Sequence, residues 1–186
     1  MAVTINGNGT VAGIAVGGLP DGIVDADMIA AGAAGATYAF IEDRKDDANG
    51  GNLTPGSWQI RDLNTETYDP GNIVSISSNT FTLANAGNYV LSWGCPSYRM
   101  KHHQSRLWNV TSDALVDNGT DGYGNTSYCQ GIVWTIGNTR ITQTGSVTYR
   151  VEHRNEHNLN HSQAGGIKSP WTDLTAYTWV RILKET

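Results

Sequence analysis

The segment Phe81–Trp93, FTLANAGNYVLSW, indicates the fold class of the chain. Its two ends alternate large apolar residues with small or polar ones, the period of two that is typical of β-strands. The ANAGN sequence between them supplies the Gly and Asn residues that tolerate the positive φ angles of tight turns. The pattern predicts a β-hairpin with one apolar face, packed against a second sheet. The residues expected on that face are Phe81, Leu83, Tyr89, Leu91 and Trp93.

The composition favours a β-rich domain. The chain has 186 residues, of which 39% are hydrophobic, 16% are charged and 22 are glycine. This length allows one domain with an appendage, and the many Gly, Asn and Thr residues indicate turns and strands rather than helices. The net charge is −5 and no basic cluster is longer than Arg99–His103. Nucleic acid is therefore not an expected partner.

The first residues show neither the pattern of a secretory signal nor an apolar run long enough to span a bilayer. We therefore expect assembly in a cytoplasm and no membrane insertion. In that compartment Cys95 and Cys129 are expected to be reduced thiols, with a disulfide between them as the open alternative.

From Thr37 onward, strand patterns alternate with segments rich in Gly, Asn, Asp and Pro. This spacing predicts an all-β domain over residues 36–186, a two-sheet jelly-roll sandwich of about ten antiparallel strands. The last predicted strand is apolar on both faces, which favours burial of one face in the core and the other against a neighbouring subunit. The predicted strands are Tyr38–Glu42, Ser57–Leu63, Ile73–Ser77, Thr80–Leu83, Asn88–Tyr98, Gln104–Asn109, Tyr128–Ile136, Arg140–Thr142, Ser146–His153 and Tyr177–Leu183.

Residues 1–35 differ from the rest of the chain. Two short strands are expected at Val3–Ile5 and Thr10–Val16, followed by a brief helical turn at Asp25–Ala31 and a linker of small residues at Gly32–Gly35. The segment has few large apolar residues and cannot bury them by itself, so other subunits or a larger body must cover them. It is interpreted as a docking arm or stem, with a disordered leader as the alternative. Its candidate attachment residues are Ile5, Val11, Ile14, Leu19, Val24 and Met28.

Two blocks of sequence resemble proteins of tailed bacteriophages. Thr4–Gly13 (TINGNGTVAG) followed by Gly17–Met28 (GGLPDGIVDADM) resembles the N-terminal module of tail-fibre and other virion structural proteins. The second block is similar to a phage domain related to the complement globular head and the tumour-necrosis-factor jelly roll. Its motifs are YAFIED at 38–43, GG at 50–51, RDLNTE at 61–66 and RLWNVT at 106–111, and Ala86–Tyr89 matches the Gly-x-Tyr that precedes a central core strand in that superfamily.

The resemblance implies a homotrimer of jelly rolls on the virion surface, joined to other virion proteins by residues 1–35. No extended shaft separates Met28 from Tyr38, which favours a short knob at the tail or on the capsid. The expected function is non-enzymatic: a short trimeric tail fibre that adheres to a host-surface glycan or receptor. The alternative is a capsid decoration, or cement, trimer. A glycan-cleaving enzyme is a third possibility, but no pair of carboxylates stands out as catalytic.

Exposed aromatic residues are the main lead to a binding surface, because Tyr and Trp offer rigid contact area and stack on sugar rings. The receptor-binding candidates are Tyr123, Tyr128 and Trp171. The candidates for the core or the trimer interface are Phe40, Leu63, Phe81, Tyr89, Leu91, Trp93, Tyr149, Trp179 and Ile182.

No cofactor is expected, although two patterns in the sequence offer potential metal ligands. His153, His157 and His161 would align on a helix, but the sequence there favours a strand end followed by a polar loop. Segments 43–52 and 117–122 offer oxygen ligands for Ca²⁺, yet neither contains the Glu that closes an EF-hand loop, which favours solvated turns. The remaining metal-ligand candidates are His153, His157, Asp47 and Asp121.

Overall fold

The computed structural model describes residues 4–5, 11–12, 36–124, 131–157, 162–171 and 173–185. The chain divides into two compact units, residues 1–35 and residues 36–185. In the first unit, the short strands β1 (Thr4–Ile5) and β2 (Val11–Ala12) pair antiparallel, with Ile5 opposite Val11. The predicted helical turn and the attachment candidates Ile14, Leu19, Val24 and Met28 lie outside the described residues, and the docking role of this unit stays a prediction.

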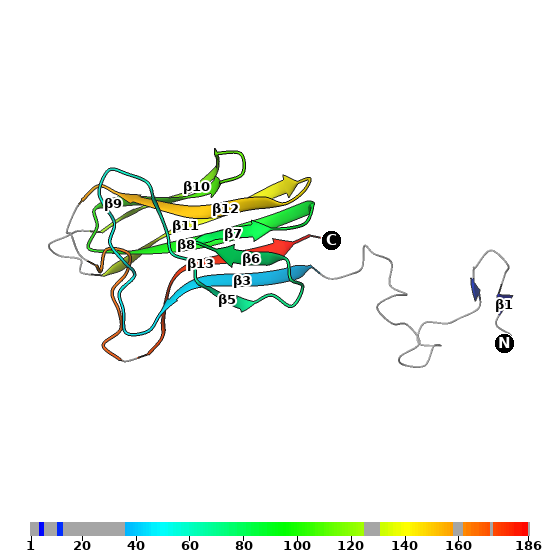
Figure 1. Ribbon diagram of the computed structural model, residues 1–186, viewed down its shortest axis with the longest axis horizontal. Coiled ribbons are helices and arrows are strands. Elements are labelled where there is room, and N and C mark those ends of the chain that lie inside the picture. Colours follow the sequence, from blue (N-terminus) through cyan, green and yellow to red (C-terminus); the bar gives the residue numbers. More distant parts are fainter. Residues whose placement is uncertain are drawn as a thin grey trace. The chain divides into compact units, whose positions relative to one another are not determined.

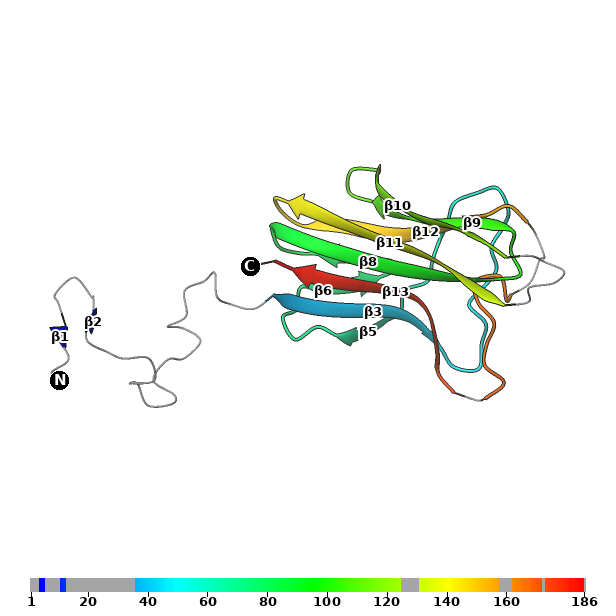
Figure 2. The same cartoon turned by 180° about the vertical axis from the view of Figure 1, so that it is seen from behind.

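The second unit, called the head below, is a sandwich of two antiparallel sheets (Figure 1; Figure 2). One sheet has the strand order β10-β9-β12-β7-β6, with β4 also paired to β12, and the other has the order β11-β8-β13-β3-β5. No helix occurs in the part of the chain that the structure describes, so none there could cross a membrane. The predicted all-β jelly roll is confirmed. Its strands are β3 (Thr37–Lys45), β4 (Gln59–Ile60), β5 (Thr65–Tyr68), β6 (Val74–Ser77), β7 (Thr80–Leu83), β8 (Gly87–Tyr98), β9 (His102–Asn109), β10 (Ala114–Tyr123), β11 (Ile132–Gln143), β12 (Val147–Asn155) and β13 (Thr175–Lys184).

Phe81–Trp93 is not the predicted hairpin. β7 pairs with β6 and β12 in one sheet, whereas β8 pairs with β11 and β13 in the other, so the turn between β7 and β8 is a corner that carries the chain across the sandwich. The Tyr89 hydroxyl donates a hydrogen bond of 3.0 Å to the Asn85 carbonyl within this corner. Period-two alternation identifies the buried face of a strand but carries no information on which sheet the strand joins.

The apolar face itself was predicted correctly. Phe81, Leu83, Tyr89, Leu91 and Trp93 are all 0% exposed, and β7 and β8 present them to one another from opposite sheets. The core candidates Leu63, Tyr149 and Ile182 are also buried, and the rings of Phe81 and Tyr149 stack at 5.6 Å. Gly137 makes room for the largest of these side chains, since a Cβ there would lie 1.9 Å from the Trp93 indole.

Two candidates from the core or interface list do not lie in the core. Phe40 is exposed and Trp179 is half-buried, and both project from the outer face of the β11-β8-β13-β3-β5 sheet. Inward positions of β3 and β13 are held instead by residues such as Ile41 and Val180. Phe40 and Trp179 therefore remain only as interface candidates.

Two strands were missed at sequence level, and both lie at sheet edges. β5 has the sequence TETY, and β10 has the sequence ALVDNGTDGY, most of which has the Asp and Gly content that predicts a turn segment between strands. An edge strand has little apolar surface to bury, so its sequence can be polar. The predicted strand Ser57–Leu63 is correspondingly too long, because only Gln59–Ile60 pairs with β12. Of the strands predicted at Tyr128–Ile136 and Arg140–Thr142, the parts from Ile132 onward belong to one continuous strand, β11, and residues 128–130 lie outside the described residues.

Candidate functional site

The interior of the head changes from apolar to polar along its length. On five strands, the inward positions near Thr37 and Lys184 are apolar, and those toward the other end of the sandwich are polar or small. On β12, for example, Tyr149 and Val151 are followed by His153. We call the second group the polar interior. It comprises Asp43, Cys95, Ser97, His103, Ser105, His153, Asn155 and Thr178, together with Arg61 from the segment after β4.

Arg61 links β13 to the segment before it through hydrogen bonds inside the polar interior. Its guanidinium is buried, with Nε donating to Thr178 Oγ1 at 2.8 Å and Nη2 donating to the Gly165 carbonyl at 2.9 Å. Asp43 is also buried, and its Oδ1 accepts a hydrogen bond of 3.2 Å from Asn64. Burial raises the pKa of Asp43 to about 6, although Lys45 and Arg61 act in the opposite direction.

The thiol of Cys95 is buried and free, and burial raises its pKa to about 11. A thiol in that environment is a packing group rather than a nucleophile. Cys129, its possible disulfide partner, lies outside the described residues.

A pair of histidines lies inside the sandwich. His103 Nδ1 and His153 Nε2 are 2.9 Å apart, and both side chains are almost fully buried. Burial lowers the pKa of His103 to about 4 and holds the pKa of His153 well below its usual value, with Arg61 adding to the effect at His153. Two neutral imidazoles satisfy this contact, one donating and the other accepting. The sequence predicts His153 at the end of a strand followed by a polar loop. β12 continues two residues further, to Asn155, and its alternation turns His153 inward with Tyr149 and Val151.

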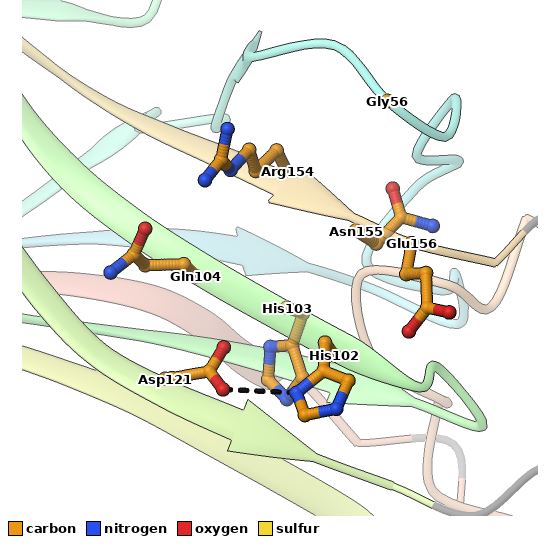
Figure 3. A pocket seen from close by; sticks show the side chains of 8 residues that line it. All are labelled: Gly56, His102, His103, Gln104, Asp121, Arg154, Asn155 and Glu156. Carbon is orange, nitrogen blue, oxygen red and sulfur yellow. Dashed lines mark hydrogen bonds and ion pairs between the residues drawn. The ribbon is translucent and has the colours of Figure 1, made fainter.

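A concave hollow of about 450 Å³ opens where β9 begins and where β10 and β12 end (Figure 3). We call it the distal pocket, because this end of the sandwich is opposite to Thr37, where the chain enters the head. His103 and Asn155 belong to both the polar interior and the pocket wall. The residues that line the pocket are Gly56, His102, His103, Gln104, Asp121, Arg154, Asn155 and Glu156.

Several contacts fix the side chains around the distal pocket. His102 Nδ1 lies 3.0 Å from Asp121 Oδ2 (Figure 3), and the His102 ring is 4.8 Å from the ring of Tyr123. The Glu156 amide donates to the His102 carbonyl at 2.8 Å, which joins the end of β12 to the start of β9. The Arg154 guanidinium lies 4.7 Å from the centre of the Trp58 ring.

The opposite sheet has an exposed apolar outer surface, which we call the apolar sheet face. It comprises Tyr38, Phe40, Tyr68, Ile132, Trp134, Ile136, Trp179 and Leu183. A hollow of about 310 Å³ lies within it, lined mainly by residues of β3, β8 and β13, including Tyr38, Phe40 and Leu183. Arg181 also lies in this face, with its guanidinium 5.0 Å from the centre of the Trp179 ring. A cluster of exposed apolar residues is uncommon on a solvent-exposed sheet and indicates an interaction site.

The structure brings only some of the predicted site residues together. Asp121 lines the distal pocket and Tyr123 lies beside it, with 55% of the tyrosine exposed. Trp171, 72% exposed, lies in the segment before β13, whose first residue pairs with the end of β3 at the same end of the head. Tyr128 lies outside the described residues.

The metal-ligand candidates are dispersed. Asp47 pairs with Lys168 at 2.5 Å, His153 pairs with His103, and the His157 carbonyl accepts a hydrogen bond from Asn155. Within the described ranges, no three His, Cys, Asp or Glu residues are placed to hold a metal ion.

Sequence reasoning missed Gln104, Arg154 and Glu156 as pocket residues. Their proximity depends on the register that sets Arg154 opposite Gln104, a pairing of positions far apart in the chain. The strand pattern did contain a sign of the pocket. His103, His153 and Asn155 are polar residues at inward positions of their strands, where a continuous hydrophobic core would have apolar residues.

No protein-family model and no curated protein sequence matches the chain. Solved structures do match it. The crystal structure of murine APRIL at pH 5.0 is 7% identical with a TM-score of 0.51, and covers 81% of this chain and 99% of its own. Murine APRIL at pH 8.0 is 6% identical with the same TM-score and coverage, and the globular domain of zebrafish complement 1qA protein is 11% identical with a TM-score of 0.47, covering 81% of this chain and 96% of its own. The similarity to APRIL shows that the head is a jelly roll of the tumour-necrosis-factor type.

Proposed function

We propose that the chain is a non-enzymatic structural protein of a tailed bacteriophage. Three heads associate into a short knob on the virion surface, residues 1–35 attach the knob to other virion proteins, and the knob adheres to the surface of the host cell. The observation that carries the proposal is the apolar sheet face, which an isolated head would leave in water.

Self-association is the simplest way to cover that face. Buried apolar surface contributes about 25 cal/mol per Å², so several aromatic side chains together provide a substantial driving force. A ring of three identical heads closes on itself and leaves no open end for further addition. The jelly-roll fold and the sequence resemblance to trimeric phage domains support this arrangement.

The direction of the strands supports adhesion at the distal end. The chain enters the head at Thr37, and Lys184 pairs with it at the same end. The distal pocket, Tyr123 and Trp171 lie at the other end, away from the connection to the attachment arm. One knob would carry three such ends, and one particle several knobs. Binding through several sites at once gives a much higher avidity than the affinity of a single weak site.

The mass of the purified full chain in solution tests self-association. We expect three chains per particle, and we expect Phe40→Asp to release single folded heads because it places a charge on the apolar sheet face. Leu115→Asp is the matched control, since Leu115 is an exposed apolar residue on β10 in the other sheet. A monomeric wild type, or equal dissociation of both variants, would contradict the trimer.

Imaging of virions labelled at the C-terminus of the chain tests the location. A few labelled knobs at the tail would support the tail-fibre function, whereas labels spread over the shell would indicate the capsid decoration trimer instead. Absence of the label from purified particles would refute a virion role altogether. Release of reducing sugar from host polysaccharide by the purified protein would refute the non-enzymatic assignment.

A further inference from the structure

We propose that the distal pocket binds a neutral saccharide. The inference rests on the proposed host-adhesion function and assigns it to one place on the head. Five features of the pocket support it: the chemistry of its lining, its charge, its aromatic rim, the contacts that fix its side chains and its unpartnered polar atoms.

The lining of the pocket is polar and offers both kinds of hydrogen-bonding group. The carboxylates of Asp121 and Glu156 accept hydrogen bonds. The Arg154 guanidinium donates, and the Gln104 amide does both. A sugar hydroxyl also donates and accepts, so adjacent hydroxyls of one ring can engage a carboxylate and a guanidinium at the same time. An apolar ligand would leave these groups unsatisfied.

The charge of the pocket favours a neutral ligand. The lining carries two carboxylates, Asp121 and Glu156, and one guanidinium, that of Arg154, while His102 pairs with Asp121. The excess of negative charge would repel a nucleic acid or an acidic polysaccharide, which argues for uncharged hexoses or N-acetylhexosamines.

An aromatic rim completes the site. Tyr123 ends β10 two residues after the pocket residue Asp121, and its ring lies 4.8 Å from that of His102, which also lines the pocket. With 55% of Tyr123 exposed, its ring provides a platform on which the apolar face of a pyranose can stack.

The pocket is held in place before any ligand binds. Arg154 stacks on Trp58, and Trp58 in turn lies 4.2 Å from the Arg106 guanidinium, which pairs with Glu152 at 2.6 Å. Polar groups fixed in this way lose little conformational freedom on binding, which favours recognition of a small, weakly binding ring.

Two buried polar atoms in the pocket wall point to a ligand. His103 Nε2 and Asn155 Oδ1 have no hydrogen-bond partner within the described part of the chain, although both side chains are at most 3% exposed. Gly122 lets the His103 ring pack against β10, because a Cβ there would lie 2.5 Å from Nε2. Buried polar atoms are normally satisfied, so a small movement of this wall that admits a ligand hydroxyl would supply the missing partner.

Ligand-observed NMR of the full chain with the methyl glycosides of glucose, galactose, mannose and N-acetylglucosamine tests the inference, together with an array of neutral oligosaccharides built from the same sugars. We expect at least one to bind, and we expect Asp121→Asn and Tyr123→Ala each to weaken binding about tenfold or more, the effect of losing one good polar or stacking contact. Both residues are exposed, so the variants are expected to fold, which their unfolding temperatures check. Asp46→Asn is the matched control, because Asp46 is an exposed aspartate that does not line the pocket.

The outcomes separate this inference from the function on which it rests. Failure of every neutral sugar to bind, or equal binding by wild type and both pocket variants, overturns the saccharide site. If wild-type protein and both variants adhere equally to host cells, adhesion stands and lies elsewhere on the head. If sugars bind at the pocket but the protein adheres to no host cell, the saccharide site stands and the adhesion function fails.

Discussion

The two halves of the sandwich interior are built from the same strands but behave differently. Near Thr37, inward residues such as Phe81, Tyr89 and Tyr149 form a continuous apolar core. Toward the distal pocket, the same strands contribute Asp43, His153 and their polar neighbours. The apolar half supplies stability that does not depend on pH. The polar half lowers stability in a pH-dependent way and leads to the surface where the pocket opens.

The largest expected effect is in the apolar half. Tyr89→Ala should destabilise the head by about 3–5 kcal/mol, because it removes a fully buried ring and leaves a cavity among Phe81, Leu91 and their neighbours. Denaturant unfolding of wild type and variant measures the difference, and the loss should be the same at pH 7 and pH 5. Unfolding like that of the wild type would refute the place of Tyr89 in the core.

The next effect is in the polar half and depends on pH. Because the pKa of His103 is lowered to about 4 in the folded head, the unfolded chain binds more protons between that value and its ordinary 6.5. Stability should therefore fall as the pH drops through this window, by about 3 kcal/mol from His103 alone. His153, whose pKa is lowered further, acts in the same direction. Unfolding free energies measured from pH 7 to pH 4 test this, and a flat profile would contradict the buried neutral pair.

Asp43 should oppose the histidines. Its pKa is raised to about 6, so the folded head holds the proton more tightly than the unfolded chain between that value and 3.8, and stability rises as the pH falls through this window. Asp43→Asn mimics the protonated form. It should stabilise the head by about 1–2 kcal/mol at pH 7, give no gain at pH 4, and make the acid loss of stability steeper. Destabilisation at pH 7 would show that the charge of Asp43 is needed by Lys45 or Arg61.

The smallest expected effect is at the pocket rim. Tyr123→Ala should leave the unfolding free energy within about 0.5 kcal/mol of wild type, because the ring is exposed and lies against the exposed ring of His102. The same variant should lose saccharide binding. A large loss of stability would contradict this prediction. It would mean that the Tyr123 side chain contributes to the packing of the head and is not a surface group.

Much of the fold was predictable from local pattern. Alternation identified Phe81, Tyr89 and Trp93 as inward-facing residues, and turn residues divided the chain into strands. The pairing of strands was not predictable in the same way, because alternation does not distinguish a hairpin from a corner between sheets. β10 was missed because an edge strand can be built from Asp, Asn and Gly.

The distal pocket was less accessible to sequence reasoning than the core. Asp121 and Tyr123 were named as candidates, but the side chains that join them come from the starts and ends of other strands. Gln104 and Arg154 meet only through the register of β9 with β12. A site built from strand ends depends on long-range pairing, which no short motif encodes.

The position of β13 has a consequence for synthesis of the protein. β13 lies between β8 and β3 and pairs with both of them. A ribosome makes β3 and β8 first and β13 after every other strand of the head, so the five-stranded sheet is split in two until translation has passed Lys184. A chain cut short before Thr175 cannot join β3 to β8 through β13. Long-range pairing of this kind is slow, which exposes the nascent chain to aggregation, but it also confines assembly to heads whose translation has run to the final strand.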